Sequence, residues 1–209
     1  MRRIGLVLAV FAAALCLAAA SRAPGSELKV PEIGKRAPRF SAVDSNGKVR
    51  KLADGKGKFV VLEWTDHGCP YVAKHYDSGN MQRLQQAYTA KGVIWFSVIS
   101  SAEGEGEFPT PEQANKDLER LKAAPTAVLL DKDGKLGRLY GAAVTPTLYV
   151  VNPKGVLIYA GAIDDIRSFE VEDVAEAKNY VSQALDEALA GQPVTVSATK
   201  PYGCPVHYK

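Results

Sequence analysis

Cys69 is the residue in this sequence most clearly placed to do chemistry. It follows an apolar run that ends at Trp64, and Pro70 comes directly after it. Proline suits the first position of a helix, where a missing N–H costs nothing. A sulfur at the start of a helix lies near unsatisfied N–H groups and a partial positive charge, which favour the thiolate. Because the thiolate is the reactive form of cysteine, the order strand, cysteine, proline, helix predicts an activated nucleophile.

The residues around Cys69 limit what that nucleophile can do. The alternative of an inert cysteine that acts as a small hydrophobe is disfavoured, because polar residues occupy positions 65–67. Val72 stands where a second cysteine would complete a C-x-x-C pair. A dithiol cycle within this segment is therefore excluded, and any thiol partner must come from elsewhere in the chain.

The N-terminus resembles a targeting segment. Residues 1–23 begin with Arg2 and Arg3 and continue with an apolar stretch and then small residues, which is the order of a secretory signal peptide. Cleavage is predicted near Ala20 or Ala23. One alternative is a membrane anchor, for which the apolar run is short. The other is a lipid attached at Cys16, which the large Leu15 before it disfavours.

Removal of this segment changes both the cysteine count and the charge. Of three cysteines, Cys69 and Cys204 remain as a potential pair. The net charge of +3 falls to about +1 for cleavage near Ala20, because Arg2 and Arg3 leave and no acidic residue does, and to 0 for cleavage after Ala23, because Arg22 leaves as well. No clustered basic stripe points to a nucleic acid partner. The signal peptide predicts an exported, periplasmic protein with no stable membrane anchor after cleavage. Disulfides persist in that compartment, so Cys69 and Cys204 could remain paired there.

Apolar strands alternate with helices along the rest of the 209-residue chain. Strands are predicted at 58–64, 92–100, 126–131, 147–152 and 156–164. Helices are predicted as a short turn after Cys69, a second helix with Met81, Leu84 and Tyr88 on one face, and helices at 111–124 and 171–190. This alternation predicts an α/β fold with a central mixed sheet flanked by helices. We expect one domain at 34–190 and a C-terminal tail at 191–209.

Turn residues refine this arrangement. Asn46-Gly47 predicts a tight hairpin turn. Pro153-Lys154-Gly155 separates the last two strands and predicts an antiparallel edge. Residues 137–142, "GRLYGA", are interpreted as a connector without regular structure.

The sequence resembles the thioredoxin-like superfamily, and in particular its redoxin branch of alkyl hydroperoxide reductase/thiol-specific antioxidant (peroxiredoxin-like) proteins and exported thiol–disulfide oxidoreductases. The resemblance covers about residues 34–165 and rests on "VVLEWTDHGCP" and on "PTAVLLDKDGKLGRLYGAAVTPTLYVVNPKGVLIYAGAID". Its most specific elements are Cys69-Pro70 after one strand and Thr145-Pro146 before another. The resemblance implies a thioredoxin-like fold and a cis Pro146 beside the active sulfur; an ordinary trans proline is the alternative.

The sequence also departs from the family patterns. The peroxiredoxin pattern P-x-x-x-(T/S)-x-x-C is absent, because Leu62 stands at the proline position and Asp66 at the threonine or serine position. Thr65 is displaced from the pattern by one residue. We expect four residues near Cys69 to support its chemistry without reacting themselves: Trp64, Thr65, Pro70 and Pro146. An atypical thiol peroxidase is an alternative function.

Oxidised Cys69 would normally be resolved by a second thiol, and Cys204 is the candidate that remains. It lies in the tail sequence "PYGCPVHY". We expect this tail to fold back and bring Cys204 to Cys69. The sequence leaves open whether the pair is catalytic or is a structural disulfide that ties down the tail, and a solvent-exposed, free Cys204 is a further alternative. The expected partner is a thiol- or disulfide-bearing protein or a small redox molecule.

The histidines provide a competing hypothesis. All three, His67, His75 and His207, lie within six residues of a cysteine. Together with Cys69 and Cys204 they could bind Cu(I) or Zn(II) in a non-enzymatic metal-handling or binding module. No ligand spacing is diagnostic, so the sequence predicts no cofactor.

Overall fold

The computed structural model describes residues 28–100 and 108–208. The signal peptide predicted at 1–23, with Cys16, lies outside the described residues. Within them, no helix has the length and apolar character needed to cross a membrane.

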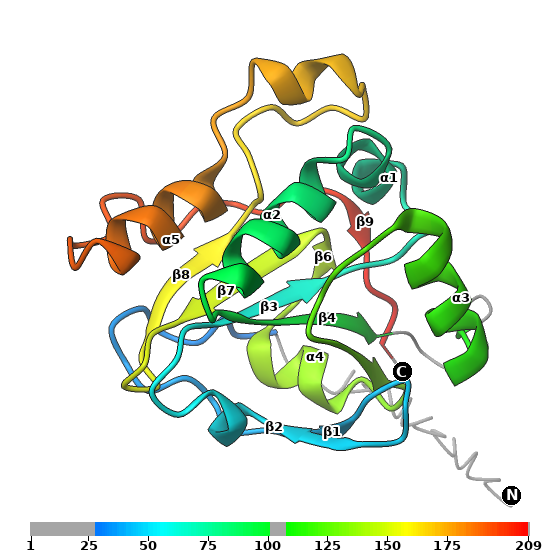
Figure 1. Cartoon of the computed structure of the whole chain (residues 1–209), viewed down its shortest axis with the longest axis horizontal. Coiled ribbons are helices and arrows are strands. Elements are labelled where there is room, and N and C mark those ends of the chain that lie inside the picture. The colour runs from blue at the N-terminus through cyan, green and yellow to red at the C-terminus, as the bar shows by residue number, and fades with distance from the viewer. Residues whose placement is uncertain (1–27, 101–107, 209) are drawn as a thin grey trace, which may run out of the picture.

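A five-stranded mixed sheet forms the centre of the molecule (Figure 1). Its strands, in spatial order, are β5 (Ala127–Asp131), β4 (Ile94–Ser100), β3 (Val60–Trp64), β7 (Thr147–Val151) and β8 (Leu157–Gly161). Strands β3, β4 and β5 are parallel, whereas β7 pairs antiparallel with both β3 and β8. This confirms the predicted mixed sheet with an antiparallel edge, and it is the arrangement of a thioredoxin-like fold.

Helices cover both faces of the sheet (Figure 1). One face packs against α1 (Pro70–Asp77), α2 (Asn80–Ala90) and α5 (Tyr180–Leu189). The other face packs against α4 (Lys135–Tyr140) and the segment that contains β1 (Ser41–Val43), β2 (Val49–Lys51) and the 3₁₀ helix η1 (Leu52–Gly55). A smaller cluster of Ile99, Ala114 and Val128 joins α3 (Pro111–Leu121) to β4 and β5.

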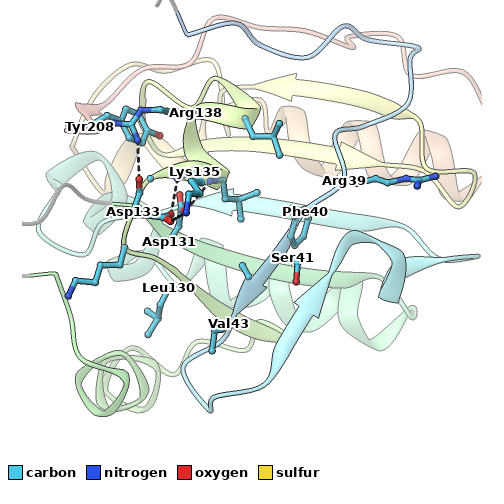
Figure 2. A pocket seen from close by; sticks show the side chains of 15 residues that line it. Arg39, Phe40, Ser41, Val43, Leu130, Asp131, Asp133, Lys135, Arg138 and Tyr208 are labelled. Atoms are coloured by element: carbon cyan, nitrogen blue, oxygen red, sulfur yellow. Dashed lines mark hydrogen bonds and ion pairs between the residues drawn. The ribbon is translucent and has the colours of Figure 1, made fainter.

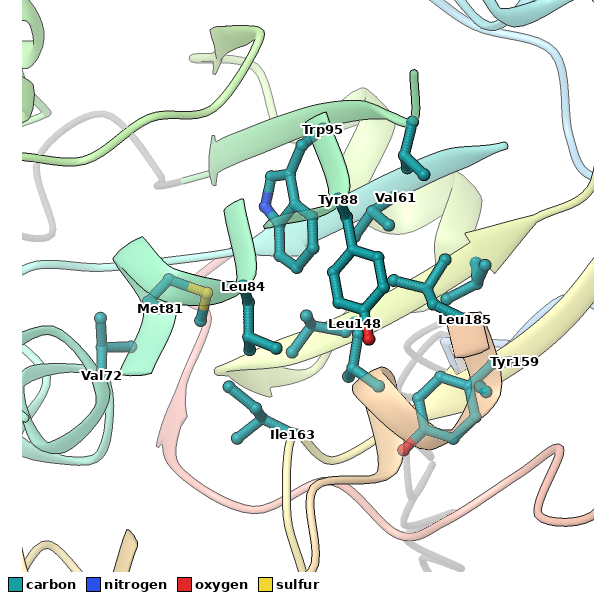
Figure 3. Packing of buried hydrophobic residues seen from close by; sticks show 14 of the residues in the cluster. Val61, Val72, Met81, Leu84, Tyr88, Trp95, Leu148, Tyr159, Ile163 and Leu185 are labelled. Carbon is teal, nitrogen blue, oxygen red and sulfur yellow. The ribbon is translucent and has the colours of Figure 1, made fainter. Parts of the chain in front are cut away.

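The side chains of β3 alternate between these two layers. Val61 belongs to the cluster under α1, α2 and α5, whereas Leu62 and Trp64 belong to the cluster on the opposite face. Figure 3 shows Tyr88 from α2 facing Leu185 from α5 within the first cluster. A strand buried on both faces explains why residues 58–64 form a nearly continuous apolar run.

Two elements differ from the sequence prediction. Residues 135–140 form helix α4, so the interpretation of 137–142 as a connector is wrong. The Asp131 carboxylate accepts hydrogen bonds from the N–H groups of Leu136 and Gly137, and so stabilises the start of this helix. The single helix predicted at 171–190 is divided into a 3₁₀ helix, η2 (Glu172–Ala175), and α5. Asn179 separates them, because its side chain accepts from the Ser182 N–H and caps α5.

Other local predictions are confirmed. Strands β1 and β2 form a hairpin around Asn46-Gly47. Helices α1 and α2 are separated at Ser78 and Gly79, where Gly79 has a left-handed φ of 71°. The Pro111 start of α3 is also as predicted.

The tail folds back along the molecule, as predicted. Ala198 bridges to Ala160 of β8. Further on, β9 (Cys204–Pro205) pairs antiparallel with β6 (Val144–Thr145), and Figure 1 shows the red tail passing beside β6. This pairing brings Cys204 close to the start of β7, beside the end of β3.

Candidate redox site

A tight turn after β3 places Cys69 at the start of α1. The Cys69 N–H donates to the Asp66 carbonyl oxygen at 3.0 Å, and the Gly68 N–H donates to Asp66 Oδ1 at 2.8 Å. Cys69 is the N-cap residue and Pro70 is the first residue of the helix. The predicted order of strand, cysteine, proline and helix is therefore present, and the Cys69 sulfur lies beside the positive end of the helix dipole.

Cys69 forms a disulfide with Cys204. The two Cα atoms are 5.9 Å apart, and the two residues are separated by 135 positions in the sequence. Cys69 is buried, with 2% of its surface exposed, whereas Cys204 is partly exposed. The expectation that the tail brings the second thiol to the first is confirmed.

The Thr145–Pro146 segment lies directly beside this disulfide. Its peptide bond is cis, as the family resemblance implied. The Thr145 carbonyl oxygen is 3.3 Å from the Cys69 sulfur, and Thr145 pairs with Cys204 between β6 and β9. The same carbonyl explains Gly203, which has a φ of 143°, because a Cβ atom at that position would collide with the Thr145 oxygen.

Trp64 and Thr65, at the end of β3 and directly after it, have different surroundings. Trp64 packs with Tyr140 and Tyr149 on the opposite face of the sheet from Cys69, and its Nε1 donates to Ser100 Oγ at 3.0 Å. Thr65 is buried after the end of β3. Its N–H donates to the Val98 carbonyl oxygen, and among the described residues its hydroxyl has no hydrogen-bond partner.

Glu63 is a buried carboxyl group that the sequence analysis did not single out. It is fully buried in β3 and accepts hydrogen bonds from four side chains: Tyr76, Gln85, Trp95 and Ser97. Burial raises the pKa of Glu63, although these four donors oppose the shift. The signal was an acidic residue inside the apolar run 58–64. Because Tyr76 lies on α1, this network connects β3 to the helix that begins at Cys69.

A second buried network surrounds Asp164 and was also missed. Asp164 Oδ2 is 3.2 Å from Lys74 Nζ and 3.8 Å from His75 Nε2. The Tyr202 hydroxyl donates to Asp164 Oδ1. Burial, with the adjacent Lys74 charge, lowers the pKa of His75 to about 3, so this imidazole is neutral at neutral pH. The sequence offered little warning, because these residues come from three distant segments.

The histidines do not assemble a metal site with the cysteines. His75 Nδ1 is 3.0 Å from Asn80 Nδ2, and the His67 ring packs edge-on against Tyr76. His207 lies in the tail, three residues beyond Cys204. In the described part of the chain, no group of three or more His, Cys, Asp or Glu side chains is arranged to hold a metal ion.

A separate pocket of about 950 Å³ lies between β1 and the turn from β5 to α4 (Figure 2). Neither cysteine lines it. The Asp133 carboxylate in its wall is paired with Lys135, and the Arg138 guanidinium lies 4.9 Å from the centre of the Tyr208 ring. Since Tyr208 belongs to the tail, the tail contributes to this pocket as well as to the redox site.

Comparison with known proteins places the chain among redox proteins of the thioredoxin-like fold, in agreement with the disulfide and the sheet topology described above. The AhpC/TSA family matches residues 33–160, so the chain belongs to the AhpC/TSA family. The thiol-disulfide oxidoreductase ResA of Bacillus thuringiensis subsp. konkukian is 31% identical over 127 residues, which cover 61% of this chain and 68% of ResA.

Solved structures support the fold. An uncharacterized conserved protein from Geobacillus kaustophilus is similar with a TM-score of 0.73 and 28% identity, over 85% of this chain and 93% of that one. The thioredoxin domain of a thiol-disulfide oxidoreductase from Bacteroides vulgatus has a TM-score of 0.50 and 22% identity, over 70% of this chain and 96% of that domain. The second likeness concerns the fold alone. Cys204 lies beyond the residues that the family matches.

Proposed function

We propose that this protein is an exported, periplasmic thiol–disulfide oxidoreductase-like redoxin, in which Cys69 is the reactive thiol and Cys204 is its partner in the same chain. The observation that carries the proposal is the Cys69–Cys204 disulfide at the start of α1, beside the cis Pro146. The similarity to ResA, which is named for thiol–disulfide chemistry, supports the same assignment.

The proposed reaction is an exchange between two disulfides. In the reduced protein, the Cys69 thiolate attacks a substrate disulfide, forms a mixed disulfide and releases one substrate thiol. Cys204 then attacks the Cys69 sulfur, which forms the internal disulfide and releases the second substrate thiol. Two electrons and two protons pass from the protein to the substrate. The reverse sequence oxidises a substrate dithiol.

The position of Cys69 suits both directions. The N–H groups at the start of α1 stabilise its thiolate, whether it acts as nucleophile or as leaving group. Access is controlled by the tail, because Cys69 is only 2% exposed when β9 covers it. A substrate disulfide therefore reaches reduced Cys69 after the tail has moved, whereas in the reverse direction a substrate thiolate attacks the internal disulfide itself.

Turnover with a model protein disulfide tests this function. The chain that begins after residue 23 should reduce the substrate with a supplied dithiol, and Cys69→Ser should abolish the reaction. Cys204→Ser that has been reduced and then freed of the dithiol should accumulate a mixed disulfide on Cys69, which mass spectrometry detects, whereas wild type releases the reduced substrate. Equal turnover by wild type and Cys69→Ser would refute the proposal.

A thiol peroxidase is the second candidate, because the chain belongs to the AhpC/TSA family. In that reaction, peroxide oxidises the Cys69 thiolate to a sulfenic acid and leaves as water or an alcohol. Cys204 would then displace water from the sulfenic acid to form the disulfide. Peroxide consumption that depends on Cys69 and is faster than disulfide exchange would favour this function.

The proposed organisation follows the same lines. Residues 1–23 are a signal peptide, residues 34–190 are the redoxin domain and residues 191–209 are the tail that carries Cys204. Expression of the full sequence in a Gram-negative host, followed by N-terminal mass analysis of the periplasmic fraction, tests the first of these. A mature N-terminus near residue 21 or 24 is expected, and an intact cytoplasmic chain would contradict it.

A further inference from the structure

Tyr202, two residues before Cys204, attaches the tail to a buried pair of charged side chains in the rest of the molecule. The Tyr202 hydroxyl donates to Asp164 Oδ1, and Lys74 Nζ lies 3.2 Å from Asp164 Oδ2. The Lys74 side chain is 0% exposed, the Asp164 side chain is 2% exposed and Tyr202 is 7% exposed. The Lys74 ammonium also donates to the Ile166 carbonyl oxygen at 2.8 Å.

These three residues come from three separate parts of the fold. Lys74 lies on α1, the helix that begins directly after Cys69. Asp164 follows β8, and Tyr202 belongs to the tail. One carboxylate therefore joins the helix that positions the first cysteine to the segment that carries the second.

We propose that Asp164, together with Lys74 and Tyr202, positions the tail so that Cys204 faces Cys69 when the disulfide is reduced. We call these three residues the tail clamp. This inference rests on the proposed function and deepens it. The clamp sets the balance between two fates of Cys69: resolution by Cys204 when the tail is bound, and attack on a substrate when the tail is released.

The other contacts near Cys204 involve neutral groups. The Val206 N–H donates to the Ala143 carbonyl oxygen at 2.9 Å, and the Tyr208 hydroxyl donates to the Ala142 carbonyl oxygen at 2.6 Å. The β6–β9 ladder contains two residue pairs, Val144 with Pro205 and Thr145 with Cys204. An isolated two-stranded pairing is marginally stable in water even when it is longer. Once the disulfide opens, the hydrogen bond from Tyr202 to Asp164, which also pairs with Lys74, restrains the tail more strongly than each of these contacts, because charge-assisted hydrogen bonds are about twice as strong as neutral ones.

The buried pair of Asp164 and Lys74 also depends on the tail for its hydrogen bonds and for its burial. Release of Tyr202 would remove one donor from Asp164 and open this buried ion pair to water. The Tyr202 ring packs edge-on against Tyr71 of α1, with ring centres 5.7 Å apart, and Lys74 Nζ lies 6.0 Å from the Tyr202 ring centre. The Tyr202 ring packs against α1 directly, whereas its hydroxyl acts on α1 through Asp164 and Lys74. A substitution that removes only the hydroxyl therefore tests the hydrogen bond and leaves the ring packing in place.

The test compares Tyr202→Phe with Tyr140→Phe. The control also loses a buried hydroxyl, which donates to the Pro38 carbonyl oxygen at 2.8 Å, but it lies on the opposite face of the sheet. The first measurement is the equilibrium in which oxidised glutathione oxidises the two protein thiols to the disulfide and becomes two reduced glutathiones. It gives the effective concentration of Cys204 at Cys69. The second is the alkylation rate of Cys69 in the fully reduced protein.

Tyr202→Phe should lower the effective concentration at least about fivefold, because hydrogen bonds to charged groups contribute more than neutral ones. It should raise the alkylation rate of Cys69, since the residue is exposed when the tail is released. Tyr140→Phe should leave both quantities within about twofold of wild type, the range that we take as unchanged. Asp164→Asn, which keeps the shape of the side chain, should act in the same direction as Tyr202→Phe.

Values for Tyr202→Phe within twofold of wild type would overturn the tail clamp, as would a fall in both the effective concentration and the alkylation rate. The glutathione equilibrium requires no protein substrate, so it can fail or succeed independently of the turnover test. A wild-type protein that forms no internal disulfide with glutathione would instead contradict the proposed function.

Discussion

Reduction of the Cys69–Cys204 disulfide should lower the free energy of unfolding by about 5 kcal/mol. The bond joins residues 135 positions apart, so it closes a loop that contains most of the domain. In the chain-entropy description, a loop of this length removes about 17 cal/mol/K from the unfolded chain, or about 5 kcal/mol at 25 °C. The folded state loses little by comparison, because the tail has further contacts with the sheet.

The same quantity can be measured in a second way. The disulfide stabilises the fold by the same free energy by which folding stabilises the disulfide. A difference of 5 kcal/mol corresponds to a reduction potential about 100 mV lower in the folded protein than in the unfolded chain. Two independent experiments must therefore give one number.

The first assay is urea unfolding of the oxidised protein and of the same protein kept reduced. The second is the redox equilibrium with glutathione in buffer and in concentrated urea. The chain that begins after residue 23 should be used, so that Cys16 does not take part. A Cys69→Ala/Cys204→Ala double variant provides a control that should unfold like the reduced protein in both presence and absence of reductant.

A loss of stability below about 1 kcal/mol in the urea experiment would refute the reasoning, because the entropic contribution of so long a loop cannot be that small in this description. A loss of about 5 kcal/mol together with an unchanged reduction potential would refute it equally. The first result would mean that the reduced unfolded chain already holds the two cysteines near each other, whereas the second would mean that one of the two measurements was not made at equilibrium.

Three further predictions concern individual residues. Since the pKa of His75 falls from 6.5 to about 3 on folding, its contribution to stability is complete above pH 6.5 and is lost as the pH falls toward 3. Wild type should lose about 2 kcal/mol more than His75→Gln between pH 7 and pH 5, as measured by urea unfolding, and parallel losses would contradict this. Glu63→Leu should destabilise the protein by about 3–5 kcal/mol in urea because four buried donors lose their acceptor, and a neutral result would show that the network is dispensable. Gly203→Ala should prevent complete formation of the disulfide in air, measured by thiol titration, because the new Cβ meets the Thr145 carbonyl. Gly191→Ala, at a tail position with open space, should still form it, and equal oxidation of both variants would contradict the steric argument.

Much of the central domain could be predicted from local patterns. The apolar run 58–64 identified β3, and Pro111 identified the start of α3, because burial and capping act within a few residues. The two errors have a common cause. Helix α4 is stabilised by Asp131, and α5 begins at the Asn179 cap, so both boundaries depend on individual side-chain hydrogen bonds that hydrophobic periodicity does not report.

The candidate site divides in the same way. Cys69, Pro70 and Pro146 were identified from short motifs, and Cys204 from the count of cysteines. Glu63 was visible as a charge within a buried strand, but its four partners come from α1, α2 and β4 and could not be read from its neighbours in the sequence.

The sequence by itself determined that a cysteine stands at the start of a helix without a C-x-x-C partner, because those features depend on adjacent residues. Only the tertiary structure decided what surrounds it. The tail returns across more than a hundred residues to place Cys204 at Cys69, and Asp164 meets Lys74 and Tyr202 from two other segments. The physical reason is that buried charges and thiols take their partners from whatever the fold brings within hydrogen-bonding or bonding distance, and no spacing along the chain encodes those distances.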